Sequence, residues 1–134
     1  MFGSLDISTS ALVAHRTRMQ VIAANMANQD AIFDANGNYA PFRRRLAIFA
    51  RGDPTTGKAG GVHVRRIMLD GSALRAKYEP GHPQADSAGN VYYPNIDPAM
   101  EMINALETTR AYEANITAAE ATKSMLQSSL RLLA

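Results

Sequence analysis

Three histidines are the side chains of this chain best suited to move protons or bind a metal near neutral pH: His15, His63 and His82. His82 lies four residues before Asp86, a spacing at which a carboxylate can orient an imidazole as a general base for hydrolysis. Two prolines and a glycine surround this pair, however, and no activated-serine motif supplies a nucleophile. We therefore expect a rigid turn in which His82 and Asp86 bind backbone groups, with a hydrolase as an alternative.

Metal and cofactor chemistry lack the required motifs. No two histidines have the spacing of a metal site, and the absence of cysteine excludes thiolate nucleophiles, Cys-ligated zinc and disulfides. Neither GxGxxG nor GxxxxGK[ST], the glycine-rich loops that cradle phosphates, is present. The sequence therefore predicts that the protein is not an enzyme and has no metal and no cofactor.

Three consecutive arginines, Arg43, Arg44 and Arg45, lie next to Tyr39 and Phe42 and are the best nucleic-acid signal. The overall charge weakens this signal, because 14 Lys and Arg against 12 Asp and Glu leave a net charge of only +2. An arginine run of this kind usually forms a solvated face or a contact between subunits. A small nucleic-acid-binding protein that uses this basic strand is the alternative that the sequence leaves open.

The apolar content of the chain is thin for its 134 residues, a length that suits one modest domain. Alanine supplies 23 of the hydrophobic residues, whereas Leu, Ile, Val and Phe together supply 27. This is near the lower limit for filling a core, so we expect partners to supply the missing contacts. The first basic residue is Arg16 and no long apolar run occurs, so we expect neither a cleaved signal peptide nor membrane insertion.

An apolar stripe predicts a helix within residues 1–30, because its members recur at steps of three, four or seven. The stripe consists of Leu5, Leu12, Met19, Ile22 and Met26. Alanines beside it leave the helix thin, which admits close approach by another helix. Asn25 and Asn28 end the pattern, and their amides can bond to the carbonyls that a helix end leaves unpaired or reach a neighbouring chain.

A second helix is predicted within residues 97–134. Asp97 supplies an N-cap oxygen, Pro98 suits the first helical position, and Glu101 and Arg131 match the helix dipole. A stripe with alternating steps of three and four residues follows, which is typical of a coiled coil. It consists of Met102, Ala105, Thr109, Tyr112, Ile116, Ala119, Lys123, Leu126, Leu130 and Leu133.

Between the helices, residues 31–96 combine short β-prone runs with turn residues. Strands are predicted at residues 45–49, 62–69, 74–78 and 91–93. The expected fold class is therefore α+β, mainly α, with long N- and C-terminal helices packing as a coiled-coil-like core around a small β-rich middle insert.

Several stretches resemble a known family, the bacterial flagellar rod and hook proteins. The N-terminal signature of that family is matched at Leu5–Leu12, Arg16–Met19 and Val21–Asn28. Two further parts are similar to the proximal rod proteins within it, namely Tyr78–Asp86 with Tyr93–Asn95, and the helical stretch Arg110–Asn115 with Lys123–Met125. One departure is His15, which stands where the family usually has Gln.

This resemblance implies a structural subunit of the basal-body rod in the periplasm. Such proteins cross the inner membrane unfolded through the flagellar type III export apparatus, without a cleaved signal. They then assemble with copies of themselves and other rod proteins into a helical tube, without catalysis, cofactor or nucleic acid. We assign the subunit interface to Leu5, Leu12, Met19, Ile22, Asn25, Met26, Asn28, Met102, Tyr112, Ile116, Leu126, Leu130 and Leu133.

Overall fold

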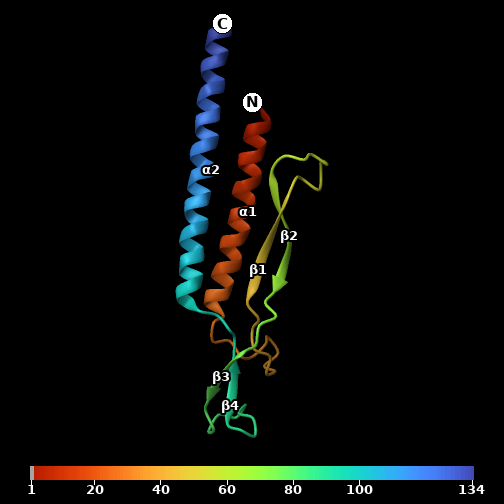
Figure 1. Ribbon diagram of the computed structural model, residues 1–134, viewed down its shortest axis with the longest axis vertical. Helices are drawn as coiled ribbons and strands as arrows, with labels where there is room; N and C mark the ends of the chain where they lie inside the picture. Colours follow the sequence, from red (N-terminus) through yellow and green to blue (C-terminus); the bar gives the residue numbers. More distant parts are fainter. Residues whose placement is uncertain (1) are drawn as a thin grey trace.

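The computed structural model describes residues 2–134, in which two long helices accompany a small β-rich middle (Figure 1). Helix α1 spans Phe2–Ala27 and helix α2 spans Pro98–Leu133. They pack against each other and run in opposite directions, so that both chain ends lie at the same end of the pair (Figure 1). The predicted mainly helical α+β class, with the terminal helices in one core, is confirmed.

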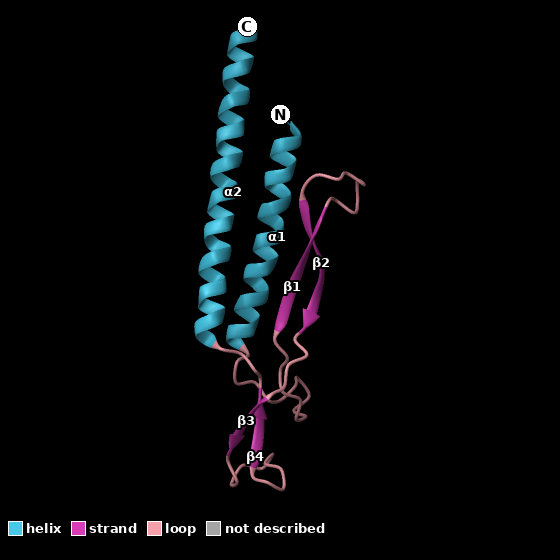
Figure 2. Ribbon diagram, in the orientation of Figure 1, coloured by secondary structure: helices cyan, strands magenta, loops and turns pink. Residues whose placement is uncertain are grey.

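Two antiparallel hairpins form the middle (Figure 2). The first joins β1 (Arg45–Arg51) to β2 (Val62–Leu69), and the second joins β3 (Arg75–Tyr78) to β4 (Asn90–Tyr93). All four strands lie within two residues of their predicted bounds. The first hairpin packs along α1, whereas the second lies beyond the base of the helix pair (Figure 2). None of the described helices combines the length and the apolar character that a membrane crossing requires.

Helix α2 begins and ends as the sequence predicts. The Asp97 side chain accepts a 2.9 Å hydrogen bond from the N–H of Ala99, and Pro98 occupies the first turn. The N–H of Ala134 bonds to the Leu130 carbonyl and closes the last turn. At 36 residues the helix is longer than α1, so its C-terminal part rises past the start of α1 (Figure 1).

The contact between the two helices is made of small and polar side chains, which corrects the predicted stripe on α2. The buried residues of α2 are Glu101, Thr108 and Thr122, one position before the predicted Met102, Thr109 and Lys123. Met102, Leu130 and Leu133 are exposed instead, while the predicted Tyr112, Ile116 and Leu126 are half-buried. Small side chains let the helix backbones approach closely, whereas Leu130, four residues after the half-buried Leu126, is exposed because α2 extends past the start of α1 there.

Helix α1 packs on two sides, of which the sequence predicts only the one facing α2. Ser8 and Ala11 are buried, and the Ser4 hydroxyl lies 3.4 Å from that of Thr122 on α2. The other side carries the first hairpin: the Ser10 hydroxyl accepts a 3.0 Å bond from the N–H of Val62. The thin, alanine-rich helix serves both neighbours, which explains why no single apolar stripe describes it.

Gly61 permits the closest approach of this hairpin to α1. Its φ of +91° is a conformation that side chains rarely adopt, and an added Cβ would lie 2.7 Å from the Ser10 hydroxyl. That hydroxyl cannot move freely, because it donates to the Ile7 carbonyl while accepting from the N–H of Val62. Glycine is thus required where β2 begins.

Replacing Gly61 with Ala should lower the free energy of unfolding by about 1–3 kcal/mol, because it combines backbone strain with the loss of the Ser10–Val62 bond. Chemical denaturation of the purified protein measures this change. Gly71→Ala is the matched control, since no atom lies within 4 Å of its added Cβ. Equal losses in the two variants would contradict the close approach.

Candidate functional site

The pair that suggested hydrolysis is a turn. His82 Nδ1 lies 3.1 Å from the N–H of Gln84, which donates to it. Asp86 accepts 2.9 Å bonds from the N–H groups of Ala88 and Asn90 and a 3.0 Å bond from the Tyr92 hydroxyl. The bond from Asn90, more than any other, holds the pKa of Asp86 below its ordinary value. The predicted turn, with both side chains bound to backbone groups, is confirmed.

The arginine run is divided among different partners. Arg43 donates a 2.7 Å bond to the Ser72 carbonyl, and the Arg44 guanidinium donates a 2.6 Å bond to Glu101. The Arg45 guanidinium lies 5.1 Å from the centre of the Phe42 ring. Two of the three cations are therefore engaged within the chain, and they do not form the continuous free stripe that a phosphate backbone requires.

A buried polar junction joins α1, β1 and α2, and Asn25 lies at its centre with only 1% of its surface exposed. Its amide oxygen accepts a 2.9 Å bond from the N–H of Arg45, and its amide nitrogen donates a 2.9 Å bond to the Arg45 carbonyl. The same nitrogen lies 3.2 Å from Glu101 Oε2. One side chain thus pairs with the start of β1 as another strand would.

The Glu101 carboxylate completes this junction and is also 1% exposed. Arg44 Nε lies 2.6 Å from its Oε1, and Arg44 Nη1 lies 3.7 Å from Asp70. Burying a carboxylate is costly unless it is paired and hydrogen-bonded, and removal of one partner of such a pair costs about 3–5 kcal/mol. Helix α2 is therefore fixed to the strand that begins beside α1.

Sequence reasoning found the members of this junction but not their roles. Asn28 does what was predicted of both asparagines, since its amide donates a 2.8 Å bond to the Ala24 carbonyl. Asn25 instead bonds across the fold, and Glu101 is more than a dipole partner. The signal that could have revealed this is the place of Glu101 on the inner side of α2. A carboxylate buried there needs a cation, and the arginine run could supply one.

The assigned interface residues fall into three groups by exposure. Asn25 and Ile22 are buried within the chain, and Met102, Leu130 and Leu133 are exposed. The half-buried ones are Leu5, Leu12, Met19, Met26, Asn28, Tyr112, Ile116 and Leu126. Their assignment to contacts between subunits stays a prediction, and the exposed group is the one most available for such contacts.

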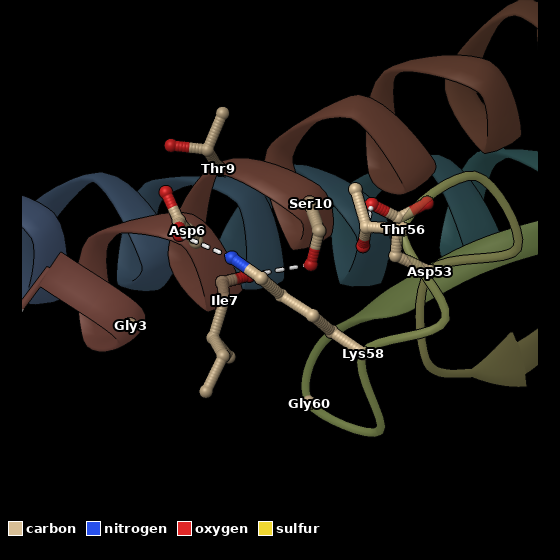
Figure 3. Close-up of a pocket in the computed structure, with 9 residues that line it drawn as sticks. All are labelled: Gly3, Asp6, Ile7, Thr9, Ser10, Asp53, Thr56, Lys58 and Gly60. Carbon is tan, nitrogen blue, oxygen red and sulfur yellow. Dashed lines mark hydrogen bonds and ion pairs between the residues drawn. The ribbon is translucent and has the colours of Figure 1, made fainter.

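An open cavity of about 470 Å³ lies between the first turns of α1 and the loop joining β1 to β2 (Figure 3). Lys58 reaches across it to Asp6, with 3.7 Å between Nζ and Oδ2. Asp53 on its wall is occupied by bonds from the hydroxyls of Thr55 and Thr56. Within residues 2–134 no group of His, Asp and Glu is placed to hold a metal ion. We assign no chemistry to this cavity.

His15 lies between α1 and the first hairpin. Its ring meets the edge of Phe49 with 5.5 Å between centroids, next to a register shift at Ile48/Phe49. Its Nδ1 is buried and has no hydrogen-bond partner among the described residues. Burial lowers the pKa of His15 below 6.5, and the positive charge of Arg18 lowers that pKa further. The folded protein therefore favours the neutral ring.

Replacing Asn25 with Leu should reduce the free energy of unfolding by about 1–3 kcal/mol for each group left unpaired, namely the Arg45 N–H, the Arg45 carbonyl and Glu101 Oε2, whereas Glu101 Oε1 keeps its bond from Arg44. Asn28→Leu is the matched control and should cost about 1 kcal/mol, because it loses a single bond to its own helix. Urea denaturation of both variants gives the comparison. An Asn28 variant as unstable as the Asn25 variant would show that the junction does not carry this stability.

The half-buried His15, whose Nδ1 is fully buried, predicts a loss of stability in mild acid. The unfolded chain binds a proton near pH 6.5 and the folded chain only at lower pH, so the free energy of unfolding should fall as pH drops below 6.5. Above that pH His15 should contribute no slope. His15→Gln keeps a polar side chain that does not titrate, and it should flatten this part of the pH profile. Parallel profiles for wild type and variant would refute the assignment.

Comparison with known proteins gives a consistent result. Residues 87–132, which include most of α2, match the family model described as flagellar basal body rod FlgEFG protein C-terminal. Over 98% of its length the chain is 39% identical to the flagellar basal-body rod protein FlgC of Bacillus subtilis, covering 97% of that protein. It is 38% identical to FlgC of Salmonella typhimurium, with 95% and 93% of the two chains covered.

A third relative, FlgC of Borreliella burgdorferi, is 35% identical, with 99% of this chain and 97% of that protein aligned. The aligned regions include the helices, both hairpins and the buried junction. Taken with the two long terminal helices and the small β-rich middle, these identities over nearly the whole length show that the chain belongs to the FlgC family of flagellar basal-body rod proteins.

Proposed function

We propose that this chain is a structural subunit of the bacterial flagellar basal-body rod, and that it polymerises through α1 and α2 with copies of itself and with other rod proteins. Membership of the FlgC family supports the rod role. A subunit with this role lies in the periplasmic part of the basal body. Transport there as an unfolded chain, through the flagellar export apparatus and without cleavage, completes the proposal.

The observation that carries the polymerisation is the exposed apolar surface of α2. Eight large apolar side chains of this helix are at least half exposed: Met100, Met102, Ile103, Leu106, Met125, Leu130, Leu132 and Leu133. They fall in two groups, one in the first turns of α2 and one near its C-terminal end, and exposed apolar surface of this extent marks contacts with other chains. The last four follow Thr122, whose hydroxyl lies beside that of Ser4 in the first turn of α1, so they belong to the part of α2 that extends past α1 (Figure 1).

Thin intramolecular packing also supports transport of an unfolded chain. The fully buried apolar residues are few and small for two helices of this length: Ala11, Ala14, Val21, Ile22, Ile32, Val91 and Ile96. A fold with so little buried apolar surface is marginally stable until neighbours add theirs. A chain of this marginal stability can be exported before it folds, and neighbouring subunits can then stabilise the fold after assembly.

Replacing Leu130 with Asp should abolish rod assembly and swimming, because the charge would enter a desolvated contact between helices. Leu130 is 58% exposed in the single chain, so folding and secretion of the variant should be retained. Leu126→Asp should block assembly as well, with some loss of stability because Leu126 is half-buried.

Ser128→Asp is the matched control for the side of α2 that carries Leu126 and Leu130, because Ser128 is exposed about 200° around the helix from both leucines and the variant adds the same charge near the same helix end. The measurement compares secreted protein, isolated basal bodies and soft-agar swimming across the three variants. Normal rods and swimming in both leucine variants would refute the role of this face.

A further inference from the structure

The hairpin of β1 and β2 is strongly basic, although the whole chain is nearly neutral. Between Arg43 and Leu69 the sequence has seven Arg and Lys residues and one acidic residue, Asp53. Arg51 and Arg66 are exposed, and no described carboxylate lies within 4.0 Å of either guanidinium. Exposed arginines suit the rims and centres of protein contacts, where they bind carboxylates in a fixed geometry.

The outer face of α2 carries carboxylates without cations. Glu113 and Glu120 are exposed, lie seven residues apart on one side of the helix and make no ion pair within the described part of the chain. Helix α1 lies between this face and the hairpin, and α2 makes no backbone contact with either strand of the hairpin (Figure 1). The unpaired charges of opposite sign are therefore kept apart within one molecule.

Exposed apolar side chains accompany the charges on both surfaces. On β2 these are Ile67, Met68 and Leu69, with 50%, 37% and 59% of their surfaces exposed. On α2 they are Met102, Ile103 and Leu106, with 50%, 55% and 54% exposed. Side chains alternate between the two faces of a strand, so Arg66 and Met68 share one face of β2 while Ile67 and Leu69 lie on the other, and we call Arg66 and Met68 the hairpin flank. We call Met102, Ile103, Leu106, Glu113 and Glu120 the helix flank.

The buried junction places the two flanks at the same height along the molecule. Asn25 bonds both to Arg45 and to Glu101, and Arg45 pairs with Leu69 across the hairpin. Leu69 and the start of α2 therefore share one level. Above that level the order is the same on both flanks, with apolar side chains first and charged ones next. A copy displaced sideways with little vertical shift would bring apolar against apolar and arginine against glutamate.

We infer that the hairpin flank of one subunit docks on the helix flank of a second copy of this chain. The inference rests on the proposed rod function and specifies one of its contacts. Because the two flanks are different surfaces, the contact is heterologous and can repeat from copy to copy around an axis. The apolar half of the hairpin flank has no use on a phosphate backbone, which favours a protein partner over a nucleic acid.

Charge exchange across the two flanks tests the pairing. Arg66→Glu should prevent incorporation into rods, and so should Glu113→Arg with Glu120→Arg, because each variant opposes like charges. The three substitutions together should restore assembly. Co-expression of the two defective variants should also restore it, since alternating copies form two correct contacts. All three residues are exposed, and unchanged thermal unfolding of the purified variants checks that folding is retained.

Disulfide trapping tests the geometry, since the natural chain has no cysteine. Met68→Cys with Ile103→Cys should give cross-linked dimers and higher multimers in oxidised basal bodies. Met68→Cys with Met125→Cys is the matched control, because Met125 is equally exposed but lies far up α2, and it should remain monomeric.

Each result is decisive. Cross-linked multimers only from the first cysteine pair, with rescue by charge exchange, support the docking. Rods that contain the protein but give no cross-link, or equal cross-linking by the control pair, would overturn the docking while leaving the rod function intact. A product at the mass of a different rod protein would overturn the choice of a second copy. Absence of the unmodified protein from isolated basal bodies would overturn the rod function itself.

Discussion

A carboxylate buried at the base of α2 must be neutralised where it lies, and the rest of the fold is arranged around that requirement. Glu101 receives the Arg44 guanidinium and the Asn25 amide, and Asn25 in turn holds both backbone groups of Arg45. Three elements distant in sequence are therefore locked in one register. A slip of any of them would leave a charge or a backbone group unpaired in a buried site, at a cost large relative to the stability of a small protein.

Above this junction the fold has little else to hold it. The inner faces of the helices are lined by Ser8, Ala11, Thr108 and Thr122, which bury little apolar area. Small side chains allow the backbones of α1 and α2 to approach closely, but they contribute little hydrophobic stabilisation because they bury little apolar area. The large apolar side chains lie on the outside, where only another chain can cover them. Specificity within the chain thus comes from polar contacts, and most of the available hydrophobic stabilisation is left for assembly.

Residues that suggest chemistry in the sequence fix loops in the structure. His82 and Asp86 close the turn before β4, and Tyr39 bonds through its hydroxyl to both backbone groups of Tyr92. Arg43 holds the Ser72 carbonyl in the loop before β3. These bonds give the β-rich middle a defined shape despite its small core. They also show that the histidine and the aspartate at a catalytic spacing are engaged in turn hydrogen bonds.

Sequence alone determined the elements of this protein and its family, because those depend on local patterns. The Asp97-Pro98 cap and the end of α1 near Asn28 follow from hydrogen bonds within a few residues, the strand bounds follow from β-prone runs between turn residues, and the family signatures are short stretches. Only the tertiary structure decided which side of each helix faces inward. A seven-residue repeat fits several neighbouring stripes equally well, and here the buried one begins at Glu101, because Arg44 and Asn25 meet it there. The pairing of side chains 20 to 76 residues apart depends on how the elements pack, which no local pattern contains.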